Sequence, residues 1–359
     1  MSLFDLAPKD SRRALFGRDS EFETLVRLIE NGRWSAILGP RMVGKTSLVK
    51  AAVRQTRRPN IYVNLWGVSR TQGLVHALIQ GLKAKQPLPA RLRDLIHRVE
   101  GVTVAGAGVS LARHPRPLST ASELIHAIGE EIGAGVVILD EVQELANVAG
   151  PLQKLLANVF NTHPKLTFVL TGSYFGLLRT LLEPTADSPM FGRPPAEIEL
   201  NAFERETSIE FLERGFREHN LRFDRNRLGS VVDRSLDGIP GWLTLFGNSV
   251  AVQRLSLERA EQASVREGKR VARSELKHFL EQREVESYWA ALRALTAQAT
   301  WSELRDALSS KRGTAVNDNT VNHVIHALRD ARFVTESGGQ YMIRDPMVRA
   351  YVRDSREPP

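Results

Sequence analysis

Four short apolar runs mark the N-terminal half of the chain, and each predicts a buried β-strand. They cover residues 35–38, 61–65, 136–139 and 167–170, and each is followed by a turn or a polar residue. Apolar residues at helical spacing lie between them, and residues 196–200 predict a fifth strand. Strands that alternate with helices are typical of an α/β domain with a mostly parallel sheet.

The strand pattern ends near Glu204, where apolar residues begin to recur at helical spacing. This pattern predicts a helical domain that ends at about residue 268. The charged stretch 266–279 is interpreted as a linker that leads into another helix. In the first half, residues 101–112 alternate small and β-branched residues around glycines, which predicts a hairpin.

The C-terminal part predicts three helices and a hairpin. The helices cover residues 284–298, 301–309 and 317–331, and the hairpin covers residues 333–343. A Gly-Gly pair at 338–339 suits the turn of that hairpin. Three helices followed by a two-stranded wing indicate a winged helix-turn-helix, whose third helix enters the major groove if the domain binds DNA.

The first apolar run leads into a glycine-rich loop. Gly39 and Gly44 let the backbone N–H groups point inward, and the next helix adds its N-terminal N–H groups. Lys45 can reach the β- and γ-phosphates, and the Thr46 hydroxyl can ligate Mg²⁺. The pattern predicts a nucleotide site made of Gly39, Pro40, Arg41, Val43, Gly44, Lys45, Thr46 and Ser47. It assigns no definite role to Arg41.

Two adjacent acids follow the third apolar run. Asp140 is expected at the C-terminal end of its strand, where open α/β sheets bind ligands, and it can hold Mg²⁺ together with Thr46. Glu141 can polarise the water that attacks the γ-phosphate. After the fourth run, the hydroxyls of Thr171 and Ser173 could sense hydrolysis, although Ser173 also suits a helix N-cap.

Charge adds a possible partner. Residues 50–118 hold twelve lysines and arginines and two acids, a net charge of +10, whereas residues 281–359 sum to zero. Such a basic segment can attract double-stranded DNA, or it can consist of solvated helix faces. A neutral winged helix also suits protein contacts rather than DNA.

Composition excludes several classes of protein. The 359 residues include no cysteine, so disulfides, thiolate metal sites and a cysteine nucleophile are excluded. There is no apolar run of the length that spans a membrane, and the first residues do not resemble a signal peptide. We therefore expect a cytoplasmic protein without membrane contact.

Four motifs together give the sequence a specific resemblance. Residues 15–25, 38–48, 136–145 and 170–178 resemble the archaeal-type ATPases of the STAND class, which are P-loop proteins related to AAA+ and origin-recognition ATPases. The resemblance implies a P-loop NTPase domain (1–202, with a basic insertion at about 50–118), a helical lid (203–270) and a winged-helix domain (271–359).

The resemblance also implies further site residues. Gly17 and Arg18 would line the adenine pocket, although Arg18 also suits an ordinary surface cation. Arg193 would stabilise transition-state charge, in cis or from a neighbouring subunit, unless it forms a surface salt bridge. Pro240, in a G-x-P motif, would contact the base from the lid, unless it only breaks a loop.

We expect a Mg²⁺-dependent ATPase that binds ATP and ADP and acts with DNA or in a nucleic-acid-associated assembly. The alternative is a nucleotide-controlled switch or scaffold that binds a protein partner or forms a homo-oligomer. A small-molecule kinase is disfavoured, because Glu141 suits water activation and no compact phosphoacceptor lid follows Thr171.

Overall fold

The computed structural model describes residues 2–85, 87–100, 117–172, 177–281 and 283–359. The chain forms two compact units. We call residues 8–39 and 45–200 the sheet unit. The helical unit comprises residues 201–359 together with the N-terminal residues up to Ala7 and the short segment Pro40–Gly44. Among the described residues, no helix is both long and apolar enough to cross a membrane.

A five-stranded parallel sheet forms the centre of the sheet unit, as the apolar runs predict. Its strands stand in the order β2-β3-β4-β1-β5. Their bounds are β1 Ser35–Leu38, β2 Asn60–Asn64, β3 Val136–Asp140, β4 Thr167–Gly172 and β5 Ala196–Glu199. All five predicted strands are therefore confirmed to within two residues at each end. Strands β1, β3 and β4 are buried at every position, which explains their continuous apolar runs.

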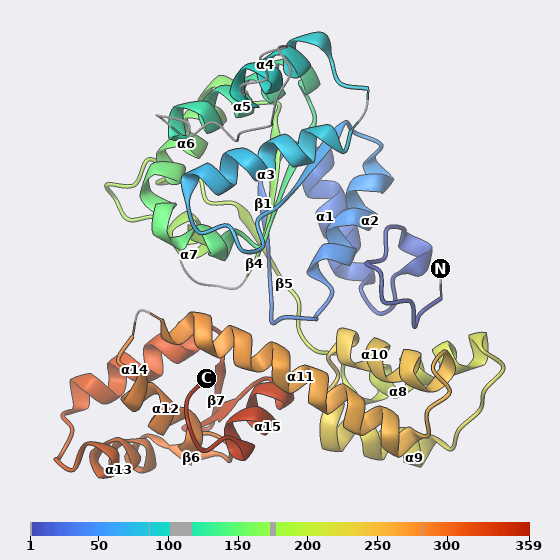
Figure 1. The fold of residues 1–359 in the computed structure, drawn as a ribbon, viewed down its shortest axis with the longest axis vertical. Helices are drawn as coiled ribbons and strands as arrows, with labels where there is room; N and C mark the ends of the chain where they lie inside the picture. Colours follow the sequence, from blue (N-terminus) through green and yellow to red (C-terminus); the bar gives the residue numbers. More distant parts are fainter. Residues whose placement is uncertain (1, 86, 101–116, 173–176, 282) are drawn as a thin grey trace, which may run out of the picture. The chain divides into compact units, whose positions relative to one another are not determined.

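Helices cover both faces of the sheet (Figure 1). Helices α1 and α2 pack on one face, and the core on the other face includes residues of α3, α4, α5 and α6. The helical segments of this unit are η1 Arg12–Ala14, α1 Asp19–Glu30, α2 Lys45–Thr56, α3 Thr71–Lys83, α4 Ala90–Glu100, α5 Pro117–Ile132, η2 Val142–Val148, α6 Ala149–Thr162 and α7 Leu177–Leu182. Burial of Trp34 and Phe168, whose rings lie 4.5 Å apart, anchors the second face.

The helical unit corrects one prediction. Its first segments are α8 Arg205–Glu218, α9 Arg225–Val231, η3 Val232–Leu236, α10 Pro240–Ala251 and α11 Leu257–Leu280. The predicted linker at 266–279 is wrong, because α11 runs through it without a break. Small or apolar residues recur every four positions on its buried face (Ala260, Ser264, Gly268, Ala272 and Leu276). The surface charges of this stretch hid that helical period.

The C-terminal helices and hairpin form as predicted. The segments are α12 Val285–Ala294, β6 Ala299–Thr300, α13 Trp301–Arg312, α14 Asp318–Asp330, β7 Val334–Ser337, β8 Gln340–Ile343 and α15 Pro346–Asp354. The Asn317 side chain caps α14 by accepting from the Thr320 N–H at 2.9 Å. Strands β7 and β8 pair antiparallel, and β6 pairs with β8. The assignment of this part as a winged helix stays a prediction.

Candidate active site

Sheet order brings two predicted motifs to one edge. Strand β1 leads toward Lys45 and strand β3 ends at Asp140, with β4 hydrogen-bonded between them. Because all these strands are parallel, their carboxyl ends meet at the same edge of the sheet, where α/β folds bind ligands. Strand β4, which contains Thr171, lies directly beside β3, which ends at Asp140.

Helix α2 begins at Lys45, directly after the glycine-rich loop. Gly44 has φ +100°, a conformation that side-chain-bearing residues rarely adopt, so glycine is required at that point. The Lys45 side chain is buried, and its Nζ donates to the carbonyl oxygen of Gly39 at 2.9 Å. Ser47 Oγ accepts from the Lys9 N–H at 3.0 Å, which ties the first turn of α2 to the N-terminal segment.

The Asp140 carboxylate receives three hydroxyl groups. Thr46 Oγ1 donates to Asp140 Oδ2 at 3.0 Å. The Tyr62 hydroxyl donates to the same oxygen, and Thr171 Oγ1 donates to Oδ1. Asp140 is only 4% exposed. Among the residues that the structure describes, no lysine or arginine forms an ion pair with Asp140, and its three hydrogen-bond donors are neutral hydroxyl groups.

This donor set fits a hard divalent cation. A buried carboxylate without a cationic partner is costly, and a nearby metal ion offsets that cost. Thr46 gives its proton to Asp140, so its oxygen lone pairs remain for a ligand. Carboxylate and hydroxyl oxygens are ligands that Mg²⁺ takes in nucleotide sites. Thr46 and Asp140 are therefore suited to hold Mg²⁺ with a nucleotide phosphate.

Glu141 is held in a strained backbone conformation. Its φ of +63° is uncommon for a residue with a side chain, and such outliers concentrate at functional sites. Its N–H donates to Thr171 Oγ1 at 3.2 Å, and its Oε2 accepts from Gln143 Nε2 at 2.5 Å. The backbone of this half-buried residue is therefore held by Thr171 and its carboxylate by Gln143.

Two residues of this cluster are not among the predicted site residues. Tyr62 comes from β2, and Gln143 comes from η2. Gln143 lies two positions after Glu141, a short spacing that a search for orienting amides could have used. Tyr62 offers a weaker signal, because its contact depends on which strand pairs with β3.

The other predicted residues of the sheet unit lie apart from this cluster in their described contacts. Gly17 has φ +61°, and Arg18 is buried with an ion pair to Glu21 at 3.1 Å. Burial lowers the pKa of Arg18, while Glu21 opposes that shift. Arg193 Nη1 donates to Asn161 Oδ1 at 2.6 Å, and its guanidinium lies 5.4 Å from the centre of the Phe160 ring. Ser173 and the hairpin predicted at 101–112 lie outside the described residues.

In the helical unit, the segment Pro40–Gly44 contacts the start of α10. The Gly241 N–H donates to the Met42 carbonyl at 2.8 Å, and a Cβ at Gly241 would lie 2.7 Å from the Met42 side chain. Pro240 occupies the first turn of α10, where its missing N–H costs nothing. The predicted G-x-P motif thus places Gly241 against a residue of the glycine-rich loop.

Arg41 gains a definite partner in the same unit. Its Nε lies 3.2 Å from Glu275 Oε1 of α11, and both side chains are largely buried. Val43 is 1% exposed. The loop residue without a predicted role is therefore paired with the long helix that leads toward the C-terminal part.

Comparison with known proteins gives one family match. A family described as an ATPase domain predominantly from Archaea matches residues 15–246. No curated protein sequence matches the chain.

Solved structures of similar fold cover nearly the whole chain. A Walker-type ATPase of Pyrococcus abyssi is 29% identical, with a TM-score of 0.78 over 98% of this chain and 99% of that one. The ORC2 protein of Aeropyrum pernix, in ADPNP-ADP complexes, is 16% identical, with a TM-score of 0.67 over 98% and 95% of the two chains. The second likeness concerns the fold alone. Together these findings confirm the archaeal-type ATPase domain and the P-loop NTPase fold, whereas the STAND class stays a prediction.

Proposed function

The chain belongs to the family of ATPase domains found predominantly in Archaea, and from that premise we propose that it hydrolyses ATP with Mg²⁺ held by Thr46 and Asp140. The observation that carries this proposal is the burial and hydrogen bonding of the Asp140 carboxylate. Its buried carboxylate accepts three hydroxyls and pairs with no cationic side chain in the described part of the chain. A buried carboxylate with these donors is suited to bind a cation.

Each neighbouring residue has a role in the proposed reaction. Lys45, which is positioned by the Gly39 carbonyl, neutralises charge on the β- and γ-phosphates. Glu141 accepts a proton from the attacking water, while Gln143 keeps its carboxylate in place. Bound Mg²⁺ would supply a positive charge for the phosphate oxygens.

Phosphate release tests this proposal directly. We expect the wild type to release phosphate from ATP with Mg²⁺ and to stop when EDTA removes the metal. Lys45→Ala should lose most of its ATP affinity in calorimetry, because it removes the charge that faces the phosphates. Unchanged hydrolysis in EDTA would refute the metal role, and unchanged ATP binding by Lys45→Ala would refute the assignment of the phosphate loop.

A second function, a nucleotide-controlled switch, is supported by ion pairs inside the helical unit. Arg41 of the loop pairs with Glu275 of α11. Asp237, three residues before the start of α10, pairs with Arg349 of α15 at 3.2 Å. The Gly241 N–H, at the start of α10, donates to the carbonyl oxygen of Met42 in the loop. These contacts give the loop a continuous connection to α11 and α15, through which nucleotide state could reach a protein partner or a second copy of the chain.

Hydrogen exchange would separate the switch from a simple ATPase. With a non-hydrolysable ATP analogue and with ADP, the amides of α11 and α15 should differ in protection in the wild type. Glu275→Gln should reduce that difference, because it removes the charge that pairs with Arg41. Equal protection of α11 and α15 in the two nucleotide states would exclude the switch. Sedimentation in the same states tests the homo-oligomer.

DNA association is a further proposal that rests on the charge of residues 50–118. Part of that charge is compensated by ion pairs, since Arg91 lies 2.5 Å from Glu130 and Lys83 lies 2.6 Å from Glu100. In the C-terminal part, Lys311 and Arg312 pair with Glu286 and Glu284, respectively. The positive charge surplus of residues 50–118 still favours this segment as the contact with DNA phosphates. The predicted winged helix is the alternative contact.

Paired charge reversals distinguish the two surfaces. We expect reversal of Arg91 and Arg93 to weaken DNA binding more than reversal of Lys311 and Arg312. The plot of log binding constant against log salt concentration should also become less steep, by roughly one to two units of slope. A larger effect at Lys311 and Arg312 would favour groove reading by the C-terminal part. A wild type without salt-dependent binding would exclude DNA as a partner.

Two assignments remain part of this proposal. Arg193, which is held by Asn161, would act on a transition state only after leaving that partner or from a second subunit. Pro240 would meet the nucleotide base from the start of α10. We also propose a cytoplasmic location, on composition alone.

A further inference from the structure

Tyr62 lies among the groups that set the geometry of Asp140. It lies on β2, one of the two edge strands of the sheet, where it is paired in register with Ile138 of β3. Side chains two positions apart on a strand share a face, so Tyr62 and Asp140 project to the same side of the sheet. The phenol is long enough to cover the offset of two residues, and its hydroxyl donates to Asp140 Oδ2.

Helix α2 contacts the ring of Tyr62. Lys50 Nζ lies 4.8 Å from the centre of the phenol ring, a cation–π contact. Thr46, one turn earlier on the same helix, donates to the oxygen of Asp140 that also accepts from Tyr62. The ring thus lies between the helix that begins at Lys45 and the strand that ends at Asp140.

The hydrogen-bond inventory limits what Asp140 can still accept. An ionised carboxylate has about four lone-pair positions. Three of them face the hydroxyls of Thr46, Tyr62 and Thr171, which leaves about one direction for a further partner. A phenol is protonated at neutral pH, so the Tyr62 hydroxyl can donate to Asp140.

We propose that Tyr62 is a positioning residue of the ATPase: it fixes the Asp140 carboxylate so that its remaining lone pair faces the Mg²⁺ of the bound nucleotide. The inference rests on the proposed Mg²⁺ role of Asp140 and Thr46. Partners of a metal-ligating carboxylate commonly change metal affinity by about 10- to 100-fold when they are removed. Tyr62 therefore determines how well the site uses Mg²⁺ rather than how well it binds nucleotide.

Equilibrium binding of a fluorescent ADP, mant-ADP, tests this without any turnover. Tyr62→Phe keeps the ring against Lys50 and removes only the hydroxyl. We expect the Mg²⁺ concentration for half-maximal enhancement of mant-ADP binding to rise about 10-fold. The mant-ADP affinity in EDTA and the thermal midpoint should match the wild type. Tyr341→Phe, which removes a phenol hydroxyl from β8, is the matched control and should leave every readout unchanged.

A second variant separates the hydroxyl from the ring. Tyr62→Leu should show the same Mg²⁺ shift together with a lower thermal midpoint, because it also loses the contact with Lys50. If Tyr62→Phe keeps the wild-type Mg²⁺ dependence, or binds Mg²⁺ more tightly, the positioning role is refuted while the metal site stands. If the wild type itself shows no Mg²⁺ dependence, the proposed metal site fails, and this inference fails with it.

Discussion

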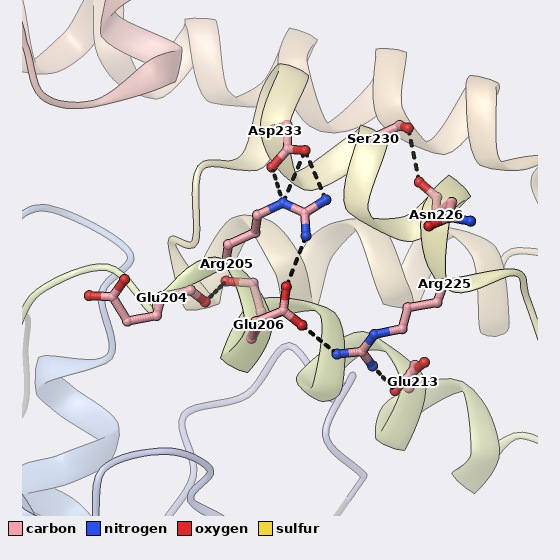
Figure 2. A network of polar contacts seen from close by, with 9 residues as sticks. Glu204, Arg205, Glu206, Glu213, Arg225, Asn226, Ser230 and Asp233 are labelled. Carbon is pink, nitrogen blue, oxygen red and sulfur yellow. Dashed lines mark hydrogen bonds and ion pairs between the residues drawn. The ribbon is translucent and has the colours of Figure 1, made fainter.

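Carboxylates are stabilised in two different ways in the two units of this protein. In the sheet unit, the buried Asp140 accepts hydrogen bonds from three hydroxyl groups and forms no ion pair with a lysine or arginine of the described residues. In the helical unit, Glu206 lies between Arg205 and Arg225 on an exposed surface of α8 and α9, with distances of 2.9 and 2.6 Å (Figure 2). Arg205 also pairs with Asp233, and Arg225 with Glu213.

The difference shows which carboxylate is prepared for a ligand. The Glu206 network consists of Arg205, Glu206, Glu213, Arg225 and Asp233. Its carboxylates are already compensated by arginines and by water, so an added cation gains little there. Hydroxyls orient Asp140 and leave its full negative charge inside the protein, where electrostatic interactions are strong. A buried carboxylate that accepts from hydroxyls, as Asp140 does, indicates a cation site when it lies at the carboxyl edge of a parallel sheet. Substitutions of equal size in the two regions test this distinction.

The largest effect is expected for Asp140→Asn. The substitution keeps the size of the side chain and removes its charge, and it also places an amide opposite hydroxyl donors. We expect phosphate release to fall by about 10³-fold, which corresponds to about 4 kcal/mol in the activation free energy. Glu206→Gln makes the same chemical change in the Glu206 network and should leave hydrolysis unaltered. Equal losses in both variants would refute the special status of Asp140.

Glu141→Gln should have the next largest effect. The variant retains the side-chain size and the contact with Gln143 but cannot accept a proton from water. We expect ATP binding in calorimetry to persist while single-turnover hydrolysis falls by about 10²–10³-fold, or about 3–4 kcal/mol. Wild-type turnover in this variant would show that another group activates the water.

Most of the catalytic edge could be predicted from sequence because its signals are local. The strands are continuous apolar runs, the glycine-rich loop follows the first of them directly, and Asp140 and Glu141 follow the third. Backbone geometry agrees with these signals, since Gly44 and Glu141 both have positive φ. Local motifs therefore identify the residues that we propose to contact phosphate and water.

The residues that orient those groups depend on pairings that sequence order does not give. Tyr62 reaches Asp140 only because β2 pairs with β3 in one register. Arg41 meets Glu275 far along the chain, on a helix whose small buried residues are hidden by surface charge. Specific side-chain contacts across the fold, rather than element types, are what the sequence did not reveal.

Asp345 offers a third case, a buried carboxylate without a cation site. It caps α15 by accepting from the N–H groups of Met347, at 2.7 Å, and Val348, and Asp237 and Arg349 also act on it. Burial raises the pKa of Asp345 to about 6. Because the folded pKa is raised, this group contributes stability at low pH that is lost as pH rises through about 6.

We therefore expect the helical unit to lose stability between pH 5 and pH 8. For this single group the free energy of unfolding should fall by about 1–2 kcal/mol over that interval. Asp345→Asn keeps an acceptor for the cap and removes the titration, so its stability should be flatter with pH. Urea unfolding of both proteins at the two pH values measures the difference. An unchanged pH dependence in Asp345→Asn would show that other groups cause it.

The smallest effect is expected in the Glu206 network itself. Hydrogen bonds from Arg225 and Arg205 lower the pKa of Glu206, so its contribution is present at neutral pH and is lost as pH falls toward its lowered pKa. Because these side chains are exposed, water and salt screen their attraction. Glu206→Gln should lower the urea midpoint slightly at low ionic strength, and the difference should vanish at about 0.5 M salt. A difference that persists in high salt would show that the network stabilises the helical unit through packing rather than through screened charge, and the contrast with Asp140 would then rest on burial alone.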